Sequence, residues 1–221
     1  MAAIDSKILD EVSSTAVSSS NSITLRISKF NPKNDSSSKF VEFKVPVQKW
    51  TTVLDTILSV KQYLDPSIAV RYSCRQASCG SCGMKINGKP ALACYTKISE
   101  LNSNIVTVEP MNNFPILRDL AVDMTQMFST HKKLKPYIIR DDSEVTNDTK
   151  EFLQTPKEVE DYLQFSYCIK CGLCNSACPT MATDSSFMGP QALTQAYRYI
   201  ADNRDNGKKD RLKIIDDSHG I

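Results

Sequence analysis

Residues 71–94 read RYSCRQASCGSCGMKINGKPALAC, and this stretch constrains the fold more than any other part of the chain. It contains four of the eight cysteines, namely Cys74, Cys79, Cys82 and Cys94. The Asn-Gly pair in its second half is typical of a tight β-hairpin turn between two short strands. We therefore expect a cysteine loop followed by a hairpin that brings Cys94 across from the first three cysteines.

The spacing of these cysteines indicates a metal site. The run C-x4-C-x2-C is typical of plant-type [2Fe–2S] sites, in which four thiolates surround two irons. Zinc is the alternative, but zinc sites usually take their cysteines as two separate pairs. Gly80 and Gly83 permit close backbone approach, and the N–H groups of such a loop are expected to point at the sulfurs. The sequence thus predicts a [2Fe–2S] cluster on Cys74, Cys79, Cys82 and Cys94.

The other four cysteines form a second motif. Residues 168–179 read CIKCGLCNSACP, which is the C-x2-C-x2-C-x3-C-P run of bacterial ferredoxins. Cys168, Cys171 and Cys174 are expected to bind three corners of a [4Fe–4S] cluster, whereas Cys178 is expected to ligate a different cluster. No cysteine remains for the fourth corner or to join Cys178, so the three-thiolate centre is expected to be unstable in this chain alone.

Composition narrows the class of protein. The chain has 27 basic and 25 acidic residues, and a net charge of +2 gives no support for nucleic-acid binding. No apolar run is long enough for a transmembrane helix, and the N-terminus lacks the layout of a secretory signal. Without export, dense cysteine groups indicate metal binding rather than disulfides.

The first half of the chain has the periodicity of a small α+β domain. Alternating apolar residues predict strands over 23–28, 41–47 and 105–108. Apolar residues at helical spacing predict a helix over 53–64, which Thr51 or Thr52 would cap.

The second half has helical periodicity. Apolar residues recur at helical steps over 120–128, and a capping sequence at 155–158 predicts a helix that presents Cys168 at its end. A further helix should begin at Pro190. Its buried face is expected to consist of Leu193, Ala196, Tyr197 and Ile200.

These patterns divide the chain into three parts. Residues 1–22 are serine-rich and are expected to form a disordered tail that cluster binding does not need. Residues 23–118 are expected to form the [2Fe–2S] domain, and residues 119–221 a helical domain. Trp50 is expected in the core of the first domain and His131 on the surface of the second.

Two stretches of this sequence resemble one known family. The segment 71–94 and the segment 187–205, FMGPQALTQAYRYIADNRD, are similar to the iron–sulfur subunits of succinate dehydrogenase and fumarate reductase. The order of the two cysteine motifs is also that of the family, and the resemblance extends over residues 23–221. It implies a β-grasp ferredoxin domain followed by an all-helical ferredoxin-like domain.

The resemblance also implies a function and partners. Such a subunit carries electrons between a flavoprotein (FAD) subunit and membrane-anchor subunits with their quinone, and it holds no dicarboxylate active site. It would lie peripherally on the cytoplasmic face of a prokaryotic membrane. Its clusters would be [2Fe–2S], [4Fe–4S] and [3Fe–4S], with Cys178 ligating the last or, in its place, a second [4Fe–4S] cluster.

Two departures from the family affect this expectation. A further cysteine-rich stretch normally follows residues 187–205, but the sequence ends at Ile221, so the helical domain is expected to be truncated and its clusters incompletely ligated. Many members have tryptophans after the Cys-Pro pair near the quinone site, where this chain has Thr180, Met181 and Ala182. Alternative functions are a ferredoxin-like carrier, the partner of another flavin-dependent reductase, or a structural binding protein with one cluster.

Overall fold

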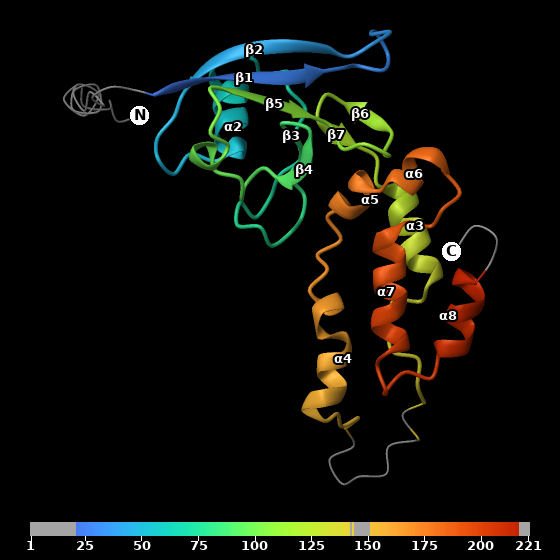
Figure 1. The fold of residues 1–221 in the computed structure, drawn as a ribbon. Helices are drawn as coiled ribbons and strands as arrows, with labels where there is room; N and C mark the ends of the chain where they lie inside the picture. Colours follow the sequence, from blue (N-terminus) through green and yellow to red (C-terminus); the bar gives the residue numbers. More distant parts are fainter. Residues whose placement is uncertain (1–20, 142, 144–150, 217–221) are drawn as a thin grey trace, which may run out of the picture.

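The computed structural model describes residues 21–141, 143 and 151–216. A β-sheet occupies one end of the elongated molecule and a group of helices the other (Figure 1). This confirms the α+β class and the order of the sheet and helical parts. The predicted tail lies outside the described residues, except for Asn21 and Ser22.

The first part is a five-stranded mixed sheet in the order β2-β1-β5-β3-β4. Strand β1 pairs antiparallel with β2 and parallel with β5, and β3 pairs antiparallel with β4 and β5. The strands are β1 (Ser22–Lys29), β2 (Lys39–Pro46), β3 (Gly83–Ile86), β4 (Lys89–Leu92) and β5 (Ile105–Glu109). The three predicted strands and the predicted hairpin are confirmed.

Helix α2 (Val53–Tyr63) crosses this sheet and forms the core with it. Leu25 and Ile27 of β1 and Ile57 of α2 are fully buried, because alternate strand residues and one helix face point to the same interior. Thr52 caps the helix and forms a capping box with Asp55. Of the two predicted caps, Thr52 is therefore the one that the structure uses.

A short hairpin joins the two parts and corrects one prediction. Strand β6 (Ile116–Arg118) pairs with β7 (Ala121–Val122), and β7 occupies the first residues of the expected helix over 120–128. The buried Asp119 carboxylate accepts N–H groups of Phe30 and Ala69 at 3.0 and 2.8 Å, which fixes a turn at this point. Helix α3 (Thr125–Lys133) begins only afterwards. The predicted boundary between residues 118 and 119 lies inside this hairpin.

Helices form the rest of the described chain. Short 3-10 helix η1 (Ile98–Glu100) belongs to the first part, and the second contains α4 (Pro156–Ser166), α5 (Leu173–Ala177), α6 (Pro179–Thr183), α7 (Pro190–Ile200) and α8 (Lys208–Ile215). The predicted capping box of α4 is present, with Thr155 and Glu158 bonded to each other's backbone N–H groups. Among the described residues, no helix has the length and apolar character needed to cross a membrane.

Helix α7 lies at the centre of this group and contacts α3, α4, α5 and α8. Its buried face is more polar than predicted. Gln191 and Gln195 are buried on it beside Ala192 and Ala196. Tyr197 is instead 46% exposed, and its ring is tilted against that of Phe165 with the centroids 4.6 Å apart. A helix surrounded on several sides buries residues outside one apolar stripe, so periodicity alone misplaced Tyr197.

Two single-residue predictions are wrong. Trp50 is 68% exposed, and the ammonium groups of Lys49 and Lys97 lie 5.1 and 5.7 Å from its ring centre. These cation–π contacts stabilise the indole at the surface. His131 is only 8% exposed, because α3 packs that face on α7, where its Nδ1 lies 3.3 Å from Nε2 of Gln191.

The buried His131 makes stability depend on pH. Burial, with Lys170 and Arg198 nearby, lowers its pKa from the ordinary 6.5. Below pH 6.5 the unfolded chain therefore binds more protons than the folded one. The stability that the neutral His131 side chain contributes is complete above pH 6.5 and is lost as the pH falls below 6.5. We expect the unfolding midpoint to drop between about pH 7 and about pH 5.5, and to drop less in His131→Gln.

The matched control for that measurement is Lys132→Gln, which changes an exposed position on the same helix. It should keep the wild-type pH dependence. An equal loss of stability in His131→Gln would show that other groups cause the effect.

A buried ion pair fixes the far end of the helical part. The side chains of Arg211 and Asp205 are fully buried and bonded to each other. Arg211 also donates to the carbonyl oxygens of Leu134, Lys135 and Tyr137, each at 2.9 Å. Arg211 therefore connects α8 to the segment that follows α3.

Removing this arginine should strongly destabilise the protein. Arg211→Ala leaves the buried Asp205 carboxylate without its cationic partner and removes the donor to three carbonyl groups, and we expect a loss of about 3–5 kcal/mol in the free energy of unfolding. Urea titration of Arg211→Ala and of Lys209→Ala, an exposed position on the same helix, measures the difference. Equal midpoints for the two variants would contradict this role.

Candidate metal centres

The first cysteine group lies on a loop that leads into β3, and Cys94 follows β4. The hairpin returns the chain to the loop, where Cys94 N–H donates to Cys82 Sγ at 3.4 Å and Ala77 N–H donates to Cys94 Sγ at 3.3 Å. The structure therefore brings the fourth cysteine to the other three, as the sequence predicted.

Backbone N–H groups surround the sulfurs of this loop. Within the described chain, six of them donate to cysteine sulfurs at 3.3–3.5 Å, from Gln76, Ala77, Ser78, Cys79, Ser81 and Cys94. Three of the six converge on Cys74 Sγ. Donors arranged in this way stabilise negative charge on sulfur, which an iron-bound thiolate carries.

Left-handed backbone makes that arrangement possible. Arg75, Ala77 and Gly80 have φ values of 57°, 59° and 73°. Residues other than glycine rarely adopt this conformation, because it strains the backbone. Strained residues of this kind are concentrated at binding sites, where the surrounding structure holds them in place. The loop is therefore shaped for its sulfurs rather than for ordinary turn geometry.

The four sulfurs experience different surroundings. Cys82 and Cys94 are buried, Cys74 is half-buried and Cys79 is exposed. Hydrogen bonding from Ser81 lowers the pKa of Cys79 to about 6, whereas burial raises the pKa of Cys82 to about 11. Metal ligation requires both thiols to be deprotonated, so metal binding would release protons. Most of them would come from Cys82, whose thiol has the higher pKa.

The second cysteine group connects three helices. Cys168 follows α4, Cys171 lies in the loop before α5, Cys174 is in α5, and Cys178 lies between α5 and α6. Lys170 and Gly172, on either side of Cys171, have φ values of 57° and 79°. This loop therefore has a left-handed residue directly on each side of Cys171.

An asparagine that sequence reasoning missed holds this group against the first part. Asn113 donates from Nδ2 to the carbonyl oxygens of Asn175 and Cys178 at 2.8 and 3.0 Å. Asn112 N–H donates to Ser176 Oγ at 3.0 Å. Nothing in the sequence pairs residues so far apart, although the φ of 62° at Asn113 is typical of an asparagine turn.

The structure brings the two cysteine groups into contact. A Cβ built on Gly80 would lie 2.8 Å from Cβ of Cys171, and one built on Gly83 would lie 3.3 Å from its carbonyl oxygen. An open cleft of about 490 Å³ adjoins this contact, and Arg71, Cys79 and Lys170 are among its lining residues. Gly80 and Gly83, which were expected to permit close backbone approach around the first cluster, thus also face the second cysteine group.

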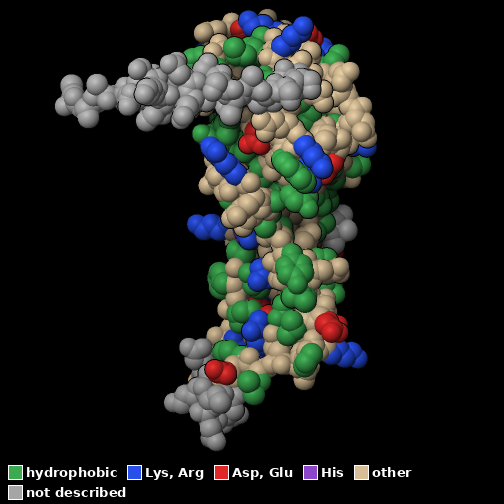
Figure 2. Space-filling view, turned by 90° about the vertical axis from the view of Figure 1, so that its left-hand side faces the viewer, with side chains coloured by type: hydrophobic (Ala, Val, Ile, Leu, Met, Phe, Trp, Pro, Cys, Tyr) green, Lys and Arg blue, Asp and Glu red, His purple; other side chains and the backbone are tan. Residues whose placement is uncertain are grey.

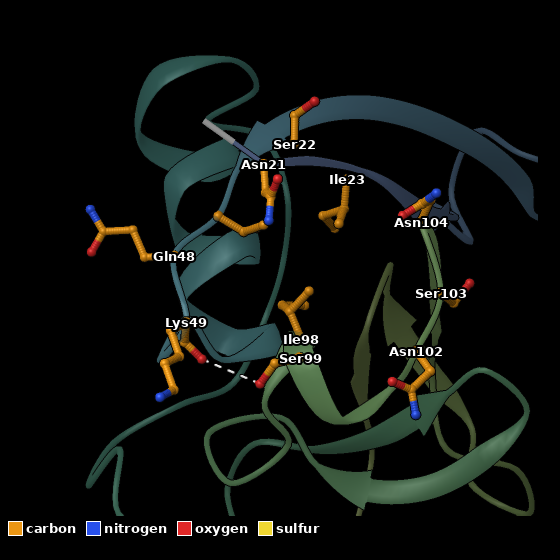
Figure 3. Close-up of a pocket in the computed structure, with 11 residues that line it drawn as sticks. Asn21, Ser22, Ile23, Gln48, Lys49, Ile98, Ser99, Asn102, Ser103 and Asn104 are labelled. Atoms are coloured by element: carbon orange, nitrogen blue, oxygen red, sulfur yellow. Dashed lines mark hydrogen bonds between the residues drawn. The ribbon is translucent and has the colours of Figure 1, made fainter. Parts of the chain in front are cut away.

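A second open pocket lies elsewhere and has different chemistry. It has a volume of about 530 Å³ and lies beside the start of β1, where amide and hydroxyl side chains such as Asn102, Asn104 and Ser99 line it (Figure 3). Lys49 is the one charged residue of its lining. Among the described residues, no three His, Cys, Asp or Glu side chains are grouped as a mononuclear metal site requires.

Comparison with protein families defines the class. Residues 24–129 match a 2Fe-2S iron–sulfur cluster binding domain, and residues 162–183 match a 4Fe-4S binding domain. The first match contains all four cysteines of the first group, and the second contains those of the second group. The chain is therefore an iron–sulfur electron-transfer protein with two cluster-binding domains.

Individual relatives identify the family. The fumarate reductase iron–sulfur subunit of Haemophilus influenzae is 39% identical over 208 residues, which cover 90% of this chain and 81% of the relative. That of Mycobacterium tuberculosis is 41% identical (87% and 78% covered), and the succinate dehydrogenase iron–sulfur subunit of Coxiella burnetii is 38% identical (90% and 84% covered). The chain belongs to the family of fumarate reductase and succinate dehydrogenase iron–sulfur subunits.

A solved structure supports the fold. A chain of the Mycobacterium smegmatis Sdh1 complex in the apo form superposes with a TM-score of 0.78 at 24% identity, covering 91% of this chain and 83% of that one. The predicted ferredoxin domain followed by a helical ferredoxin-like domain is confirmed.

Proposed function

We propose that this chain conducts single electrons between a flavoprotein subunit and a membrane anchor with its quinone, in succinate oxidation or fumarate reduction. The network of six N–H donors on the cysteine sulfurs, close to a second cysteine motif, carries this proposal. The ligands would be Cys74, Cys79, Cys82 and Cys94 for [2Fe–2S], Cys168, Cys171 and Cys174 for [4Fe–4S], and Cys178 for a [3Fe–4S] or further [4Fe–4S] centre.

The residues of this chain would position and tune the centres. When bound, the clusters supply one-electron redox chemistry, and the protein supplies ligation, burial and hydrogen bonds. The N–H groups directed at Cys74 favour the more negative, reduced state. Buried Cys82 and Cys94 keep one side of the site away from water. Dicarboxylate chemistry would belong to the flavin of the partner, so this chain would have no catalytic residue.

The partner surface would include the loop around Cys94. Tyr95, the next residue, is 74% exposed, and the exposed Trp50 ring lies beside Lys97 further along the same loop. Exposed aromatic residues of this kind often dominate binding at protein interfaces. Hydrophobic and basic side chains also lie interspersed along the face in Figure 2. As a subunit of such a complex, the chain would lie peripherally on the cytoplasmic face of a prokaryotic membrane.

Mixing the anaerobically purified chain with its flavoprotein and succinate tests the proposal. We expect the EPR signal of a reduced [2Fe–2S] centre to appear in wild type, and to be absent in Cys82→Ala. If the flavoprotein fails to reduce the centre while an unrelated ferredoxin reductase does so, the chain is a general carrier and the proposal is wrong.

A further inference from the structure

The two cysteine loops approach each other most closely where Gly80 faces Cys171. A Cβ on Gly80 would lie 2.8 Å from Cβ, 2.9 Å from Cα and 3.3 Å from the backbone N of Cys171. Real Cβ atoms do not approach other atoms so closely. The atoms that this Cβ would meet are the backbone N, Cα and Cβ of Cys171, which cannot move aside as the end of a long side chain can. Any residue other than glycine at this position would therefore push the loops apart.

Both sides of this contact are conformationally fixed. Gly80 has a φ of 73°, and Lys170 and Gly172 on either side of Cys171 are also left-handed. The Asn113 side chain holds the following helix by two hydrogen bonds, to the carbonyl oxygens of Asn175 and Cys178. The separation of the loops is thus set by Gly80 on one side and by Asn113 on the other.

The contact joins a ligand-bearing segment of each centre. Gly80 follows Cys79 directly in the chain, and Cys171 belongs to the second motif. A route from Cys79 through the Gly80 backbone to Cys171 therefore contains one non-bonded step. Electron tunnelling slows steeply with every added gap between bonded atoms. An open cleft lies along one side of the contact, so no packed protein bridges the gap there. The non-bonded step at Gly80 therefore determines the rate along this route.

We propose that Gly80 is a positioning residue for electron transfer, and that its missing side chain sets the distance between the two centres. This inference rests on the proposed function. One electron leaves the centre held by Cys79 and enters the centre held by Cys171, and no bond or proton is transferred. Asn113 acts with Gly80, because it holds the second loop in place.

The test compares Gly80→Ala with Gly88→Ala. Gly88 has a φ of 81° and no atom within 4 Å of a built Cβ, so the control carries the same backbone strain without the contact. Both purified proteins are reduced anaerobically, and EPR records the iron-centre signals and the magnetic coupling between them. We expect Gly80→Ala to retain both signals but lose the coupling, whereas Gly88→Ala keeps it.

Three results would overturn the proposal. The first is wild-type coupling in Gly80→Ala. The second applies if Gly80→Ala fails to fold or loses iron. Asn113→Ala, which changes no residue of either cysteine loop, should then weaken the coupling, and unchanged coupling would refute the role. The third is a loss of coupling in Gly88→Ala equal to that in Gly80→Ala, which would attribute the effect to strain at a left-handed residue rather than to the contact with Cys171.

Discussion

Cys82→Ala is expected to remove the [2Fe–2S] centre completely and to lower the iron content by about two atoms per chain. Cys82 is buried between the loop and the hairpin and accepts the N–H of Cys94. Alanine would remove one of the four thiolates that would hold the cluster, so the cluster should not survive purification. Iron analysis and the EPR spectrum of the reduced protein measure the loss.

The matched control for this variant is Ser78→Ala. Ser78 contributes only its backbone N–H to Cys74 Sγ, at 3.3 Å, and alanine retains that donor. The control should keep its iron and its signal. A Cys82→Ala protein with full iron content would contradict the four-cysteine assignment.

Cys171→Ala is expected to abolish the second centre and leave the [2Fe–2S] signal in place. Cys171 lies at the left-handed loop between α4 and α5, where the motif predicts one of three cubane ligands. Its replacement should remove the multi-iron signal of the second site, whereas Cys178→Ala should retain it. Iron analysis with EPR of both oxidised and reduced protein separates the two outcomes.

The pair of variants also tests the role of Cys178. Pro179 begins α6 immediately after this cysteine and directs the chain away from α5. If wild type holds a stable [4Fe–4S] cluster that Cys178→Ala destroys, then Cys178 completes the cubane and the three-thiolate assignment is wrong. Loss of the [2Fe–2S] signal in Cys171→Ala would mean that the variant has disturbed both loops.

Local signals in the sequence were sufficient for most of the architecture. The Asn-Gly turn, the capping residues Thr52 and Thr155, and the cysteine spacings each depend on neighbours in the chain, and the structure has the elements that they predict. Cysteine spacing is informative because a cluster fixes where its ligands must be.

The predictions that failed concern residues whose burial or conformation depends on tertiary contacts. Trp50 is apolar enough for a core but is stabilised at the surface by two lysines, and His131 is polar but is buried by the packing of α3 on α7. The turn at Asp119 depends on N–H groups from distant segments. The contact of Gly80 with Cys171 joins residues of two domains, so no local pattern could reveal it.

Metal analysis and EPR of the anaerobically purified wild-type chain test the central claim most directly. The account predicts a reddish protein whose reduced form gives a [2Fe–2S] signal of about two irons per chain, together with a second multi-iron centre that is lost readily because only three thiolates hold it. A colourless protein that binds zinc in place of iron at the first cysteine group would contradict it.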